Sequence, residues 1–437
     1  MNKTSVKKHN ICVIGAGYVG LVAAACFSKL GHKVVCVDNN LDKISALRKG
    51  KVPNYEPGLD LIIKNSVRKS LLYFSDSIQS GVKQAQVIFL AVGTPSRPNG
   101  EADLTALEKV AFEIAKNLDS YKVIVEKSTV PAQTGIKIKK TIQRYAKKNI
   151  EFDVASNPEF LREGSAVSDF LKPDRIVIGV ESKKAEGILR SLYSGIKAPL
   201  LVTDINTAEL IKHASNSFLA TKISFANALS LVCEKTGADI DKVSQGMGLD
   251  QRIGKGFLKA GVGFGGSCFP KDVDAFIHLS KKVGYDFKLL TEVRNINRQQ
   301  RMRFVEKIKE ELWILKDKVI AILGLSFKPD TDDLREAPAL YIIDMLKKEG
   351  AILRAYDPQA LLKAKKILDK VELVDSPYKA IKGADCLALI TEWDEFKNLN
   401  FTKIKKSMRL PLIVDGRNIY DRKHLEKLGF KYIGMGR

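Results

Sequence analysis

The sequence predicts an α/β protein with two doubly wound parallel-sheet domains joined by a long central helix. Apolar runs at residues 10–14 and 33–37 alternate with helical patterns, as expected for buried parallel strands. A helical stretch begins near residue 206, and the strand–helix–strand order returns near residue 318. The 437 residues suffice for two or three domains. We expect an N-terminal domain at 1–205, a helical region at 206–310 and a C-terminal domain at 311–437.

The first expected strand ends in a glycine-rich turn. Gly15-Ala-Gly17-Tyr-Val-Gly20 lies between this strand and a helix expected at 21–30. In this setting Gly15 makes the tight turn, Gly17 lets the backbone approach a pyrophosphate and Gly20 permits close helix–strand packing. The pyrophosphate would lie on the helix N-terminus, where free N–H groups and the dipole favour anions. The pattern predicts a Rossmann-type dinucleotide site, the alternative being a glycine turn without a ligand.

The acid that ends the second strand indicates which dinucleotide is bound. Asp38 lies 23 positions after Gly15, where a carboxylate accepts hydrogen bonds from the adenosine ribose hydroxyls. The same charge would repel a 2′-phosphate, so NAD is the expected cofactor. Lys43, five residues later, could soften the exclusion of NADP.

Further strands are expected at 87–92, near 122–127, at 152–156 and at 175–179. Thr94 follows the first of these, and the polar turn Ser128-Thr129-Val-Pro131 follows the second. Polar residues just after the carboxyl ends of strands face the ligand crevice in open α/β sheets. Thr94 and Thr129 are therefore candidate ligand contacts.

The helical middle carries a lysine and an asparagine at helical spacing. Lys212 and Asn216 are four residues apart, so they share one face of a helix and could point into one site. The alternative, an ordinary surface pair, is the commoner outcome for such a spacing taken alone.

A cysteine lies in the glycine-rich segment Gly261-Val-Gly-Phe-Gly-Gly-Ser-Cys268-Phe-Pro-Lys271-Asp272. No packing need is expected for these glycines, which would instead let backbone N–H groups crowd a ligand. A thiol beside a cation is held partly as the nucleophilic thiolate. A thiol combined with a nicotinamide predicts oxidation through a thioester, whereas the alternative is a turn with an ordinary buried cysteine.

The other cysteines have no catalytic pattern. Cys12, Cys26 and Cys36 lie in apolar strand or helix contexts and are expected in the core. The six cysteines form no C-x-x-C pair or metal-ligand spacing, so we expect a reducing, cytoplasmic environment and no metal.

The second lobe is expected to bind a ligand other than a dinucleotide. A strand at 318–323 leads into a long polar loop at 324–336, a helix at 339–348 and a strand that ends on Asp357. The glycine triplet is missing from this repeat of the design. Later strands are expected at 386–390 and 412–415.

The formal net charge of +22 is spread in ones and twos along the chain. Such a surface attracts anionic substrates. Nucleic-acid binding is the alternative, but no recognised motif accompanies the charge, so no nucleic-acid partner is expected. No apolar run approaches the roughly 20 residues of a spanning helix, and no signal-type stretch follows the basic start, so no membrane association is expected.

The ordered motifs resemble those of the UDP-glucose/GDP-mannose dehydrogenase family, and within it the UDP-glucose 6-dehydrogenases. The resemblance covers nearly the whole chain and rests on residues 15–20, 128–131, 157–164, 250–254, 261–272, 324–330 and 415–417. It implies two Rossmann-like lobes around a central helix that forms a homodimer interface. It also implies oxidation of UDP-glucose to UDP-glucuronate by two NAD⁺, through a thiohemiacetal and a thioester on Cys268.

The resemblance also assigns roles to residues. It implies catalytic roles for Cys268, Lys212, Asp272, Asn216, Glu159 and Thr129. It implies NAD contacts for Gly15, Gly17, Tyr18, Val19, Gly20, Asp38, Lys43, Thr94, Thr129, Glu163, Lys271 and Arg335. It implies nucleotide-sugar contacts for Glu159, Phe160, Leu161, Arg162, Glu163, Lys212, Asn216, Arg252, Phe257, Gly265, Phe327, Lys328 and Arg417.

In the implied mechanism, Lys212 and Asn216 hold a developing oxyanion. Asp272 and Glu159, with a water near Thr129, transfer protons. Arg252 reaches the neighbouring subunit's site, the alternative being a surface arginine or an ion pair within its own subunit. Other open readings are the same chemistry on GDP-mannose or a UDP-N-acetyl-hexosamine, a two-electron dehydrogenase with a structural cysteine, and a non-catalytic NAD-binding scaffold.

Overall fold

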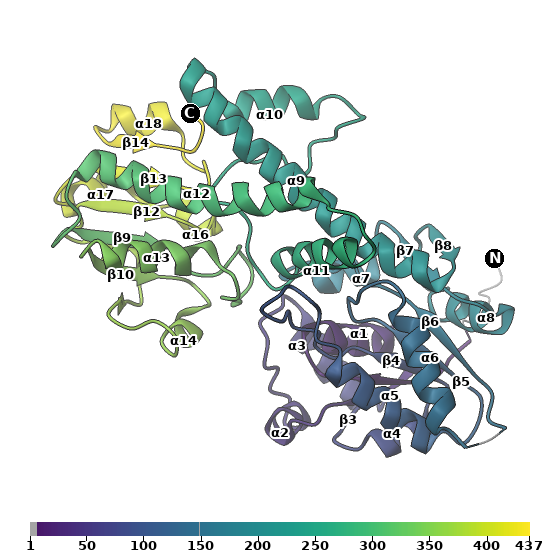
Figure 1. Cartoon of the computed structure of the whole chain (residues 1–437). Coiled ribbons are helices and arrows are strands. Elements are labelled where there is room, and N and C mark those ends of the chain that lie inside the picture. The colour runs from purple at the N-terminus through teal and green to yellow at the C-terminus, as the bar shows by residue number, and fades with distance from the viewer. Residues whose placement is uncertain (1–6, 148) are drawn as a thin grey trace, which may run out of the picture. The chain divides into compact units, whose positions relative to one another are not determined.

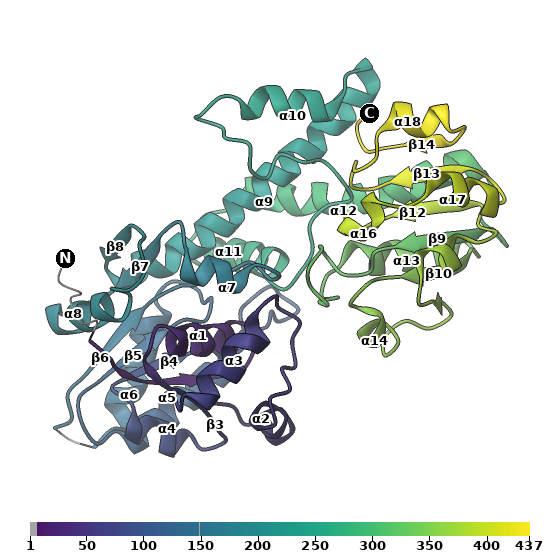
Figure 2. The ribbon, with the colours of Figure 1, turned by 180° about the vertical axis from the view of Figure 1, so that it is seen from behind.

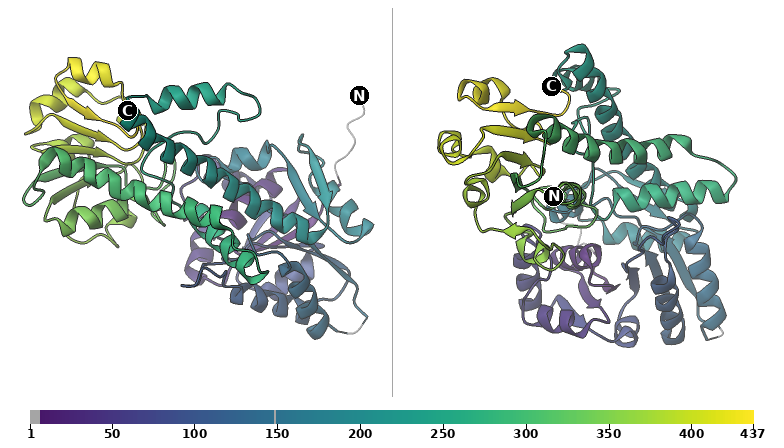
Figure 3. Two further views of the ribbon diagram at one scale, coloured as in Figure 1. Left: turned by 45° about the horizontal axis from the view of Figure 1, so that its top comes forward. Right: turned by 60° about the vertical axis from the view of Figure 1, so that its left-hand side comes forward.

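The computed structural model describes residues 7–147 and 149–437, so part of the basic start of the chain lies outside it. The chain divides into two compact units. The first contains the residues up to Ser215 together with Asp274–Val283, and the second contains Asn216–Val273 and Gly284–Arg437. Figures 1, 2 and 3 show that each unit is built on a sheet with helices on both faces.

The first unit contains an eight-stranded sheet with the strand order β3-β2-β1-β4-β5-β6-β7-β8. Neighbouring strands are parallel except for β6 and β7, which pair antiparallel. The strands are β1 Asn10–Ile14, β2 Lys33–Val37, β3 Leu72–Ser75, β4 Val87–Leu90, β5 Lys122–Glu126, β6 Phe152–Ser156, β7 Ile176–Gly179 and β8 Leu200–Thr203. The order reverses direction between β1 and β4, the kind of switch point where open α/β sheets bind ligands.

Side chains that alternate along β1 build the two cores of this unit. Ile11 and Val13 pack on one face of the sheet with the side chains of α1, and Cys12 and Ile14 pack on the other with those of α5. The helices are α1 Tyr18–Lys29, α2 Leu41–Arg48, α3 Leu59–Arg68, α4 Ile78–Gln84, α5 Thr105–Asn117, α6 Thr134–Tyr145, α7 Ala166–Leu171 and α8 Lys183–Leu192.

Four helices follow β8 before the second sheet begins. They are α9 Ile205–Thr236, α10 Ile240–Gly248, α11 Phe269–Lys282 and α12 Lys288–Leu312. With 32 residues, α9 is the long central helix that the sequence predicted. Both α9 and α11 contribute residues to both units.

The second unit contains a six-stranded, all-parallel sheet with the order β11-β10-β9-β12-β13-β14. Its strands are β9 Val319–Leu323, β10 Ile352–Tyr356, β11 Glu372–Leu373, β12 Cys386–Leu389, β13 Leu412–Asp415 and β14 Lys431–Ile433. Ile320 and Ile322 pack with α12, whereas Ala321 and Leu323 face the opposite core. The remaining helices are α13 Pro338–Lys348, α14 Leu361–Ala364, α15 Pro377–Ile381, α16 Asp394–Lys397, α17 Phe401–Ser407 and α18 Arg422–Lys427.

The predicted fold class is confirmed, and the element boundaries differ little from the expected ones. The helix after the glycine turn begins at Tyr18, three residues before its expected start, and β4 ends at Leu90. The loop between β9 and α13 is long and irregular, as predicted. Cys12, Cys26 and Cys36 are buried core residues, also as predicted. Among the described helices, none has both the length and the apolar character needed to span a bilayer.

Candidate functional site

The glycine turn after β1 has the backbone geometry that its pattern predicted. Gly15 has φ +106°, and an added Cβ would lie 2.4 Å from the Ala91 carbonyl oxygen. An added Cβ at Gly20 would lie 1.9 Å from the Gly15 oxygen. At Gly17, by contrast, no protein atom lies within 4 Å of an added Cβ. Packing therefore requires Gly15 and Gly20, whereas Gly17 leaves open the approach to the α1 N-terminus that a pyrophosphate needs.

Asp38 lies at the carboxyl end of β2, next to this turn. Its carboxylate accepts hydrogen bonds from Ala16 N–H at 2.8 Å, from Asn40 N–H at 3.0 Å and from Lys43 Nζ at 2.9 Å. Burial raises the pKa of Asp38, but these donors outweigh it and the net pKa lies below the ordinary value. Asp38 is thus an ionised acceptor at the position where the sequence predicts a ribose contact. Lys43, which could soften the exclusion of NADP, is paired with Asp38.

Asp38→Ala is expected to weaken NAD⁺ use. Removing an ionised hydrogen-bond acceptor should raise KM for NAD⁺ about 10- to 100-fold, because such a bond is worth about 1.5–3 kcal/mol. Losing the charge should also narrow the preference for NAD⁺ over NADP⁺, measured as the ratio of their kcat/KM values. Asp76→Ala, which removes an exposed carboxylate paired with Arg48, is the matched control and should leave both values unchanged. A wild-type preference for NADP⁺ would contradict the assignment.

Two loops at the carboxyl ends of β4 and β5 are joined by side-chain hydrogen bonds. Thr94 Oγ1 donates to the Thr129 carbonyl at 2.8 Å, and Ser128 Oγ donates to the Val92 carbonyl at 2.7 Å. Thr94 is buried. These bonds bring together two residues that the sequence predicted as NAD contacts and fix the turn that carries Thr129.

Glu159 and Lys212 form a buried ion pair in the first unit. Lys212 Nζ lies 3.0 Å from Glu159 Oε1, and each side chain is 4% exposed. Glu159 Oε2 accepts the Leu161 N–H at 2.5 Å, and Lys212 Nζ lies 5.4 Å from the centre of the Phe160 ring. The fold therefore brings together two of the predicted catalytic residues. Water does not screen the charges of a buried pair, so removing either partner would leave the other charge uncompensated.

A second lysine lies near this pair and was missed by the sequence reasoning. Lys127, at the end of β5, is buried and donates to the Asn157 carbonyl at 3.1 Å and to Asn157 Oδ1 at 3.0 Å. Burial lowers the pKa of Lys127 to about 8, and the field of Lys212 acts in the same direction, whereas Glu159 raises it. Its place beside the predicted turn at 128–131 was the only sequence signal.

The segment 159–164 is held by a residue that the sequence analysis also missed. Glu56 is buried, accepts the Gly164 N–H at 2.7 Å and contacts the hydroxyl of Tyr18. Burial, followed by the hydrogen bond to Glu56, raises the pKa of Tyr18 above its ordinary value. Glu163 is also buried, while Arg162 is exposed and pairs with Asp169 at 2.6 Å. Within this unit Glu56 links the glycine turn to the segment predicted to bind the sugar.

In the second unit, Asn216 and Asp272 form a direct hydrogen bond. Asn216 Nδ2 donates to Asp272 Oδ2 at 2.6 Å, and both residues are buried. Lys271 Nζ lies 2.6 Å from the other oxygen of the same carboxylate, Asp272 Oδ1. Asp272 is thus the partner of two predicted site residues. The ammonium of Lys271 is paired with this carboxylate. The positive charge that lies near Cys268 in the sequence is therefore partly compensated by Asp272.

The expectation that no packing need explains the glycines before Cys268 is wrong. An added Cβ would lie 2.6 Å from the Gly416 oxygen at Gly261, and 2.4 Å from Asn297 Oδ1 at Gly263. At Gly265 it would lie 2.3 Å from the Glu336 oxygen, and at Gly266 it would lie 2.7 Å from the Phe327 ring. Packing within the second unit therefore requires small residues at all four positions. Cys268 itself is half-buried, with its sulfur 3.6 Å from Ser267 Oγ.

The same loop packs against the loop that follows β9. The Gly266 N–H donates to the Arg335 carbonyl at 2.9 Å, and Gly266 lies against Phe327. The Arg335 side chain pairs with Asp333 at 2.6 Å and is 63% exposed. Lys328 Nζ lies 5.6 Å from the centre of the Phe327 ring. Three residues predicted as ligand contacts thus lie on one loop beside the Cys268 segment.

Arg417 lies on the turn after β13. Its Nε donates to the Ile390 carbonyl at 2.7 Å, and its Nη1 donates to the Gly263 carbonyl at 3.1 Å. Arg417 therefore contacts the backbone of the Cys268 segment. The buried Asp415 accepts the backbone N–H groups of Arg417 at 2.9 Å and Ile419 at 2.8 Å, which fixes the turn.

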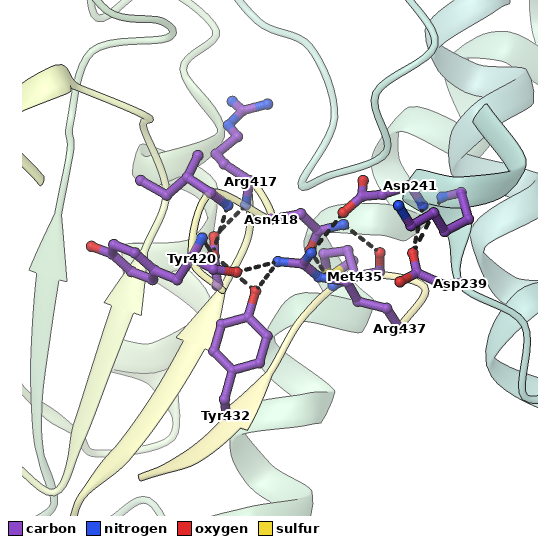
Figure 4. Close-up of polar contacts among 11 residues, drawn as sticks. Asp239, Asp241, Arg417, Asn418, Tyr420, Tyr432, Met435 and Arg437 are labelled. Atoms are coloured by element: carbon purple, nitrogen blue, oxygen red, sulfur yellow. Dashed lines mark hydrogen bonds and ion pairs between the residues drawn. The ribbon is translucent and has the colours of Figure 1, made fainter. Parts of the chain in front are cut away.

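A network around Arg437 holds the other side of this turn (Figure 4). Asn418, with φ +55°, exchanges two hydrogen bonds with the backbone of Met435, at 2.8 and 2.9 Å. Arg437 donates to the Tyr420 carbonyl at 2.8 Å and to the Tyr432 hydroxyl at 2.5 Å, and it pairs with Asp241 of α10 at 2.7 Å. The segment after β14 thus joins α10 to the turn that carries Arg417. No local sequence pattern predicts this network.

Arg252 and Phe257 lie in the connection between α10 and α11. The Arg252 side chain is 90% exposed and pairs with Asp250 at 2.6 Å. The ion pair within the subunit, given above as the alternative, is thus present in the single chain. Phe257 is half-buried with φ +64°, and its ring centre lies 6.2 Å from that of Phe269.

The second sheet has an acid equivalent to Asp38, but its oxygens are occupied by the protein. Asp357 follows β10 and accepts N–H groups from Leu325 at 2.8 Å and Ser326 at 3.0 Å. The indole of Trp393 donates to the same carboxylate at 3.2 Å. Asp357 is fully buried, so it holds the loop after β9 instead of facing a ribose.

Three domain families match the chain. The NAD binding domain of the UDP-glucose/GDP-mannose dehydrogenase family matches residues 9–197. The central domain of that family matches residues 206–299, and its UDP binding domain matches residues 321–422.

Similar proteins match along nearly the full length. UDP-glucose 6-dehydrogenase TuaD of Bacillus subtilis is 46% identical over 98% of this chain and 93% of its own length. UDP-glucose 6-dehydrogenase of Rhizobium meliloti is 44% identical over 98% of this chain and 99% of its own. The structure of a UDP-glucose dehydrogenase from Pyrobaculum islandicum has a TM-score of 0.94 at 37% identity, covering 100% of this chain and 99% of that one.

Proposed function

Because this chain belongs to the UDP-glucose/GDP-mannose dehydrogenase family and binds NAD, we propose that it oxidises UDP-glucose to UDP-glucuronate with two NAD⁺. The observation that carries the proposal is the set of residues around Cys268 in the second unit. A half-buried cysteine follows a tightly packed glycine segment, and the helix that begins directly after it, α11, carries Asp272, which is hydrogen-bonded to Asn216. A thiol can hold an aldehyde on the enzyme as a covalent adduct, which a second oxidation at the same carbon requires.

The proposed reaction has four steps. The C6 alcohol loses a proton and a hydride and becomes an aldehyde. The thiolate of Cys268 adds to the aldehyde carbon, and protonation of the resulting oxyanion gives a thiohemiacetal. Loss of that proton and of a second hydride gives a thioester, and water then releases the carboxylate, a proton and the thiol. NAD⁺ accepts one hydride in each oxidation, so one product requires two cofactor molecules.

The chain's own residues supply the proton transfers and the charge stabilisation. Lys212 would stabilise the oxyanion of the tetrahedral intermediates through its ammonium group, together with the amide of Asn216. Glu159, paired with Lys212 at 3.0 Å, would take protons from the alcohol or from a water near Thr129. Asp272 would orient Asn216 and accept a proton from the reacting oxygen.

The substrate assignment is supported by relatives named as UDP-glucose 6-dehydrogenases at 44–46% identity. A UDP-D-ManNAc dehydrogenase from Pyrococcus horikoshii is less similar, at 28% identity with a TM-score of 0.87. Oxidation of another nucleotide sugar is therefore the alternative. We further propose a cytoplasmic location. The proposed domain limits are 1–205 for the NAD-binding domain, 206–310 for the central helical dimerisation region with the catalytic cysteine loop, and 311–437 for the UDP-sugar-binding domain.

The first test counts NADH. Purified protein incubated with UDP-glucose and NAD⁺ should form two NADH per sugar acid, measured by absorbance and by quantifying the product. GDP-mannose and a UDP-N-acetyl-hexosamine serve as competing substrates in the same assay. One NADH per product with free aldehyde accumulating would contradict the thioester route. If only another nucleotide sugar were oxidised, that sugar would replace UDP-glucose as the proposed substrate.

A homodimer through α9 is also proposed, with a second copy of the chain as the partner. Phe218, Phe225 and Val232 recur every seven residues along α9 and are 66%, 54% and 54% exposed. Large exposed apolar side chains in one stripe are typical of a surface that another protein covers. In the dimer, Arg252 would leave its exposed pair with Asp250, which is worth little, and contact the partner's sugar nucleotide.

Mixing two inactive variants tests this arrangement. If Arg252 acts across the dimer, an Arg252→Ala chain mixed with a Cys268→Ala chain forms one intact site per mixed dimer. Activity should then recover to about a quarter of the wild-type value, because half of the dimers are mixed and each has one good site. Recovery should fail if Phe225→Asp in both chains blocks dimer formation. No recovery despite confirmed subunit exchange would place Arg252 in its own subunit's site.

A further inference from the structure

Two buried carboxyl groups lie beneath the turn that carries Thr129. Glu126 is the last residue of β5 and Glu209 lies near the start of α9, and they are 1% and 2% exposed. Glu126 Oε2 is buried without a hydrogen-bond donor among the described residues, and the neighbouring side chain whose charge acts on it is that of Glu209. Two ionised carboxylates that lie together away from water repel each other and have no proton to donate, so such a pair is expected to hold one proton between them.

The surrounding donors decide where the proton lies. Both oxygens of Glu209 accept backbone N–H groups, Oε2 from Gln133 at 2.7 Å and Oε1 from Gly135 at 2.6 Å. These groups belong to the N-terminus of α6, where a negative charge is favoured. Glu209 is therefore the carboxylate and Glu126 is the acid.

The groups that face Glu126 are consistent with this assignment. Burial, followed by the neighbouring charge of Glu209, raises the pKa of Glu126 well above its ordinary value. The hydroxyl of Ser156 on β6 and the ammonium of Lys127, which follows β5, act in the opposite direction but do not outweigh burial.

The pair fixes the backbone on the far side of the Thr129 turn. Gln133, which precedes α6, has the left-handed φ of +74°, an unfavourable conformation that the Glu209 hydrogen bond helps to hold. One turn along α9, His213 Nε2 lies 2.8 Å from the Val130 carbonyl. The N-terminus of α6 also packs closely on α9, because an added Cβ at Gly135 would lie 2.5 Å from Ile205 Cγ2. Glu209 and His213 thus hold the turn against the helix that carries Lys212.

We propose that Glu126 and Glu209 form a proton-sharing pair that positions the Ser128–Pro131 turn, and with it Thr129, for NAD-dependent oxidation. The pair acts through the backbone of the turn, because Glu209 accepts the backbone N–H groups of Gln133 and Gly135. This inference rests on the proposed function only for the role of Thr129. Whether the two groups share a proton can be tested by the pH dependence of unfolding, which needs no activity assay.

The shared proton has a consequence for stability. In the unfolded chain Glu126 ionises above about pH 4.3, whereas in the folded protein it keeps its proton to a higher pH. Unfolding therefore releases a proton in this range, and the contribution of Glu126 to stability falls as pH rises from about 4.3 to its folded pKa. For one proton, the folding equilibrium constant decreases up to about tenfold per pH unit.

Glu126→Gln is the direct test, because a neutral amide can donate to Glu209 as the protonated acid does but cannot ionise. We expect the wild type to lose stability relative to Glu126→Gln as pH rises from 5 to 8, measured by denaturant unfolding of the full chain. Glu108→Gln, which neutralises an exposed carboxylate on α5, is the control and should not show this pH-dependent gain. A constant difference between the wild type and Glu126→Gln across this range would overturn the shared proton.

Kinetics test the positioning role. In Glu209→Gln an amide NH₂ must face a backbone N–H at the start of α6, so the turn should loosen. We expect kcat/KM for NAD⁺ to fall about tenfold or more, with KM for UDP-glucose changed less than twofold, while Glu126→Gln retains most of its activity at pH 7. Unchanged kinetics in a folded Glu209→Gln chain would overturn the positioning role. A wild type that forms no NADH from UDP-glucose would instead refute the proposed function. The pH dependence of unfolding would then still show whether Glu126 and Glu209 share a proton.

Discussion

Cys268→Ser is expected to lower kcat by about a thousandfold or more. An alkoxide is a much poorer leaving group than a thiolate, so the ester formed on serine should hydrolyse slowly, and nucleophile replacements in covalent catalysis cost about this much or more. Mass spectrometry of the intact chain after incubation with UDP-glucose and NAD⁺ should then show a covalent sugar adduct, or the chain should be nearly inactive.

The control for this experiment is a cysteine in the core. Cys26 is fully buried within α1, so Cys26→Ala removes a thiol without touching the segment around Cys268. We expect a lower melting temperature, because a small cavity remains, and an unchanged kcat for the folded fraction. If Cys268→Ser turned over at the wild-type rate, Cys268 would be structural and the chain would be a two-electron dehydrogenase or a non-catalytic protein.

Lys212→Met is expected to have the second-largest effect. Removing one preorganised oxyanion donor typically costs about 10²–10³ in kcat. The same change leaves Glu159 buried without its partner, which costs about 3–5 kcal/mol unless the carboxyl takes up a proton. Steady-state kinetics and denaturant unfolding measure the two effects separately.

A second substitution separates catalysis from stability. In Lys212→Met combined with Glu159→Gln the charge of Glu159 is removed together with that of its partner, so part of the lost stability should return while kcat stays low. Lys235→Met, an exposed lysine on the same helix, is the matched control and should change neither quantity. Full activity in the folded Lys212→Met chain would exclude Lys212 from the chemistry.

The sequence by itself determined the fold class and the local features of the candidate site. Strand β1, the turn at Gly15 and Gly20, and Asp38 at the end of β2 were predictable because each depends on residues close together in the chain. Apolar periodicity determines which segments become strands or helices, and a positive φ selects glycine at a turn. The close match of α13 to its expected range has the same local origin.

Only the tertiary structure decided which distant groups meet. The glycines before Cys268 pack against Gly416, Asn297, Glu336 and Phe327. These partners lie too far along the chain from the glycines for a local sequence pattern to predict the contacts. Glu126 and Glu209 are likewise 83 residues apart, and each alone reads as an ordinary polar residue. Burial makes the difference, because a carboxyl group that loses water must find a donor or a proton, and the fold alone determines which partner lies within reach.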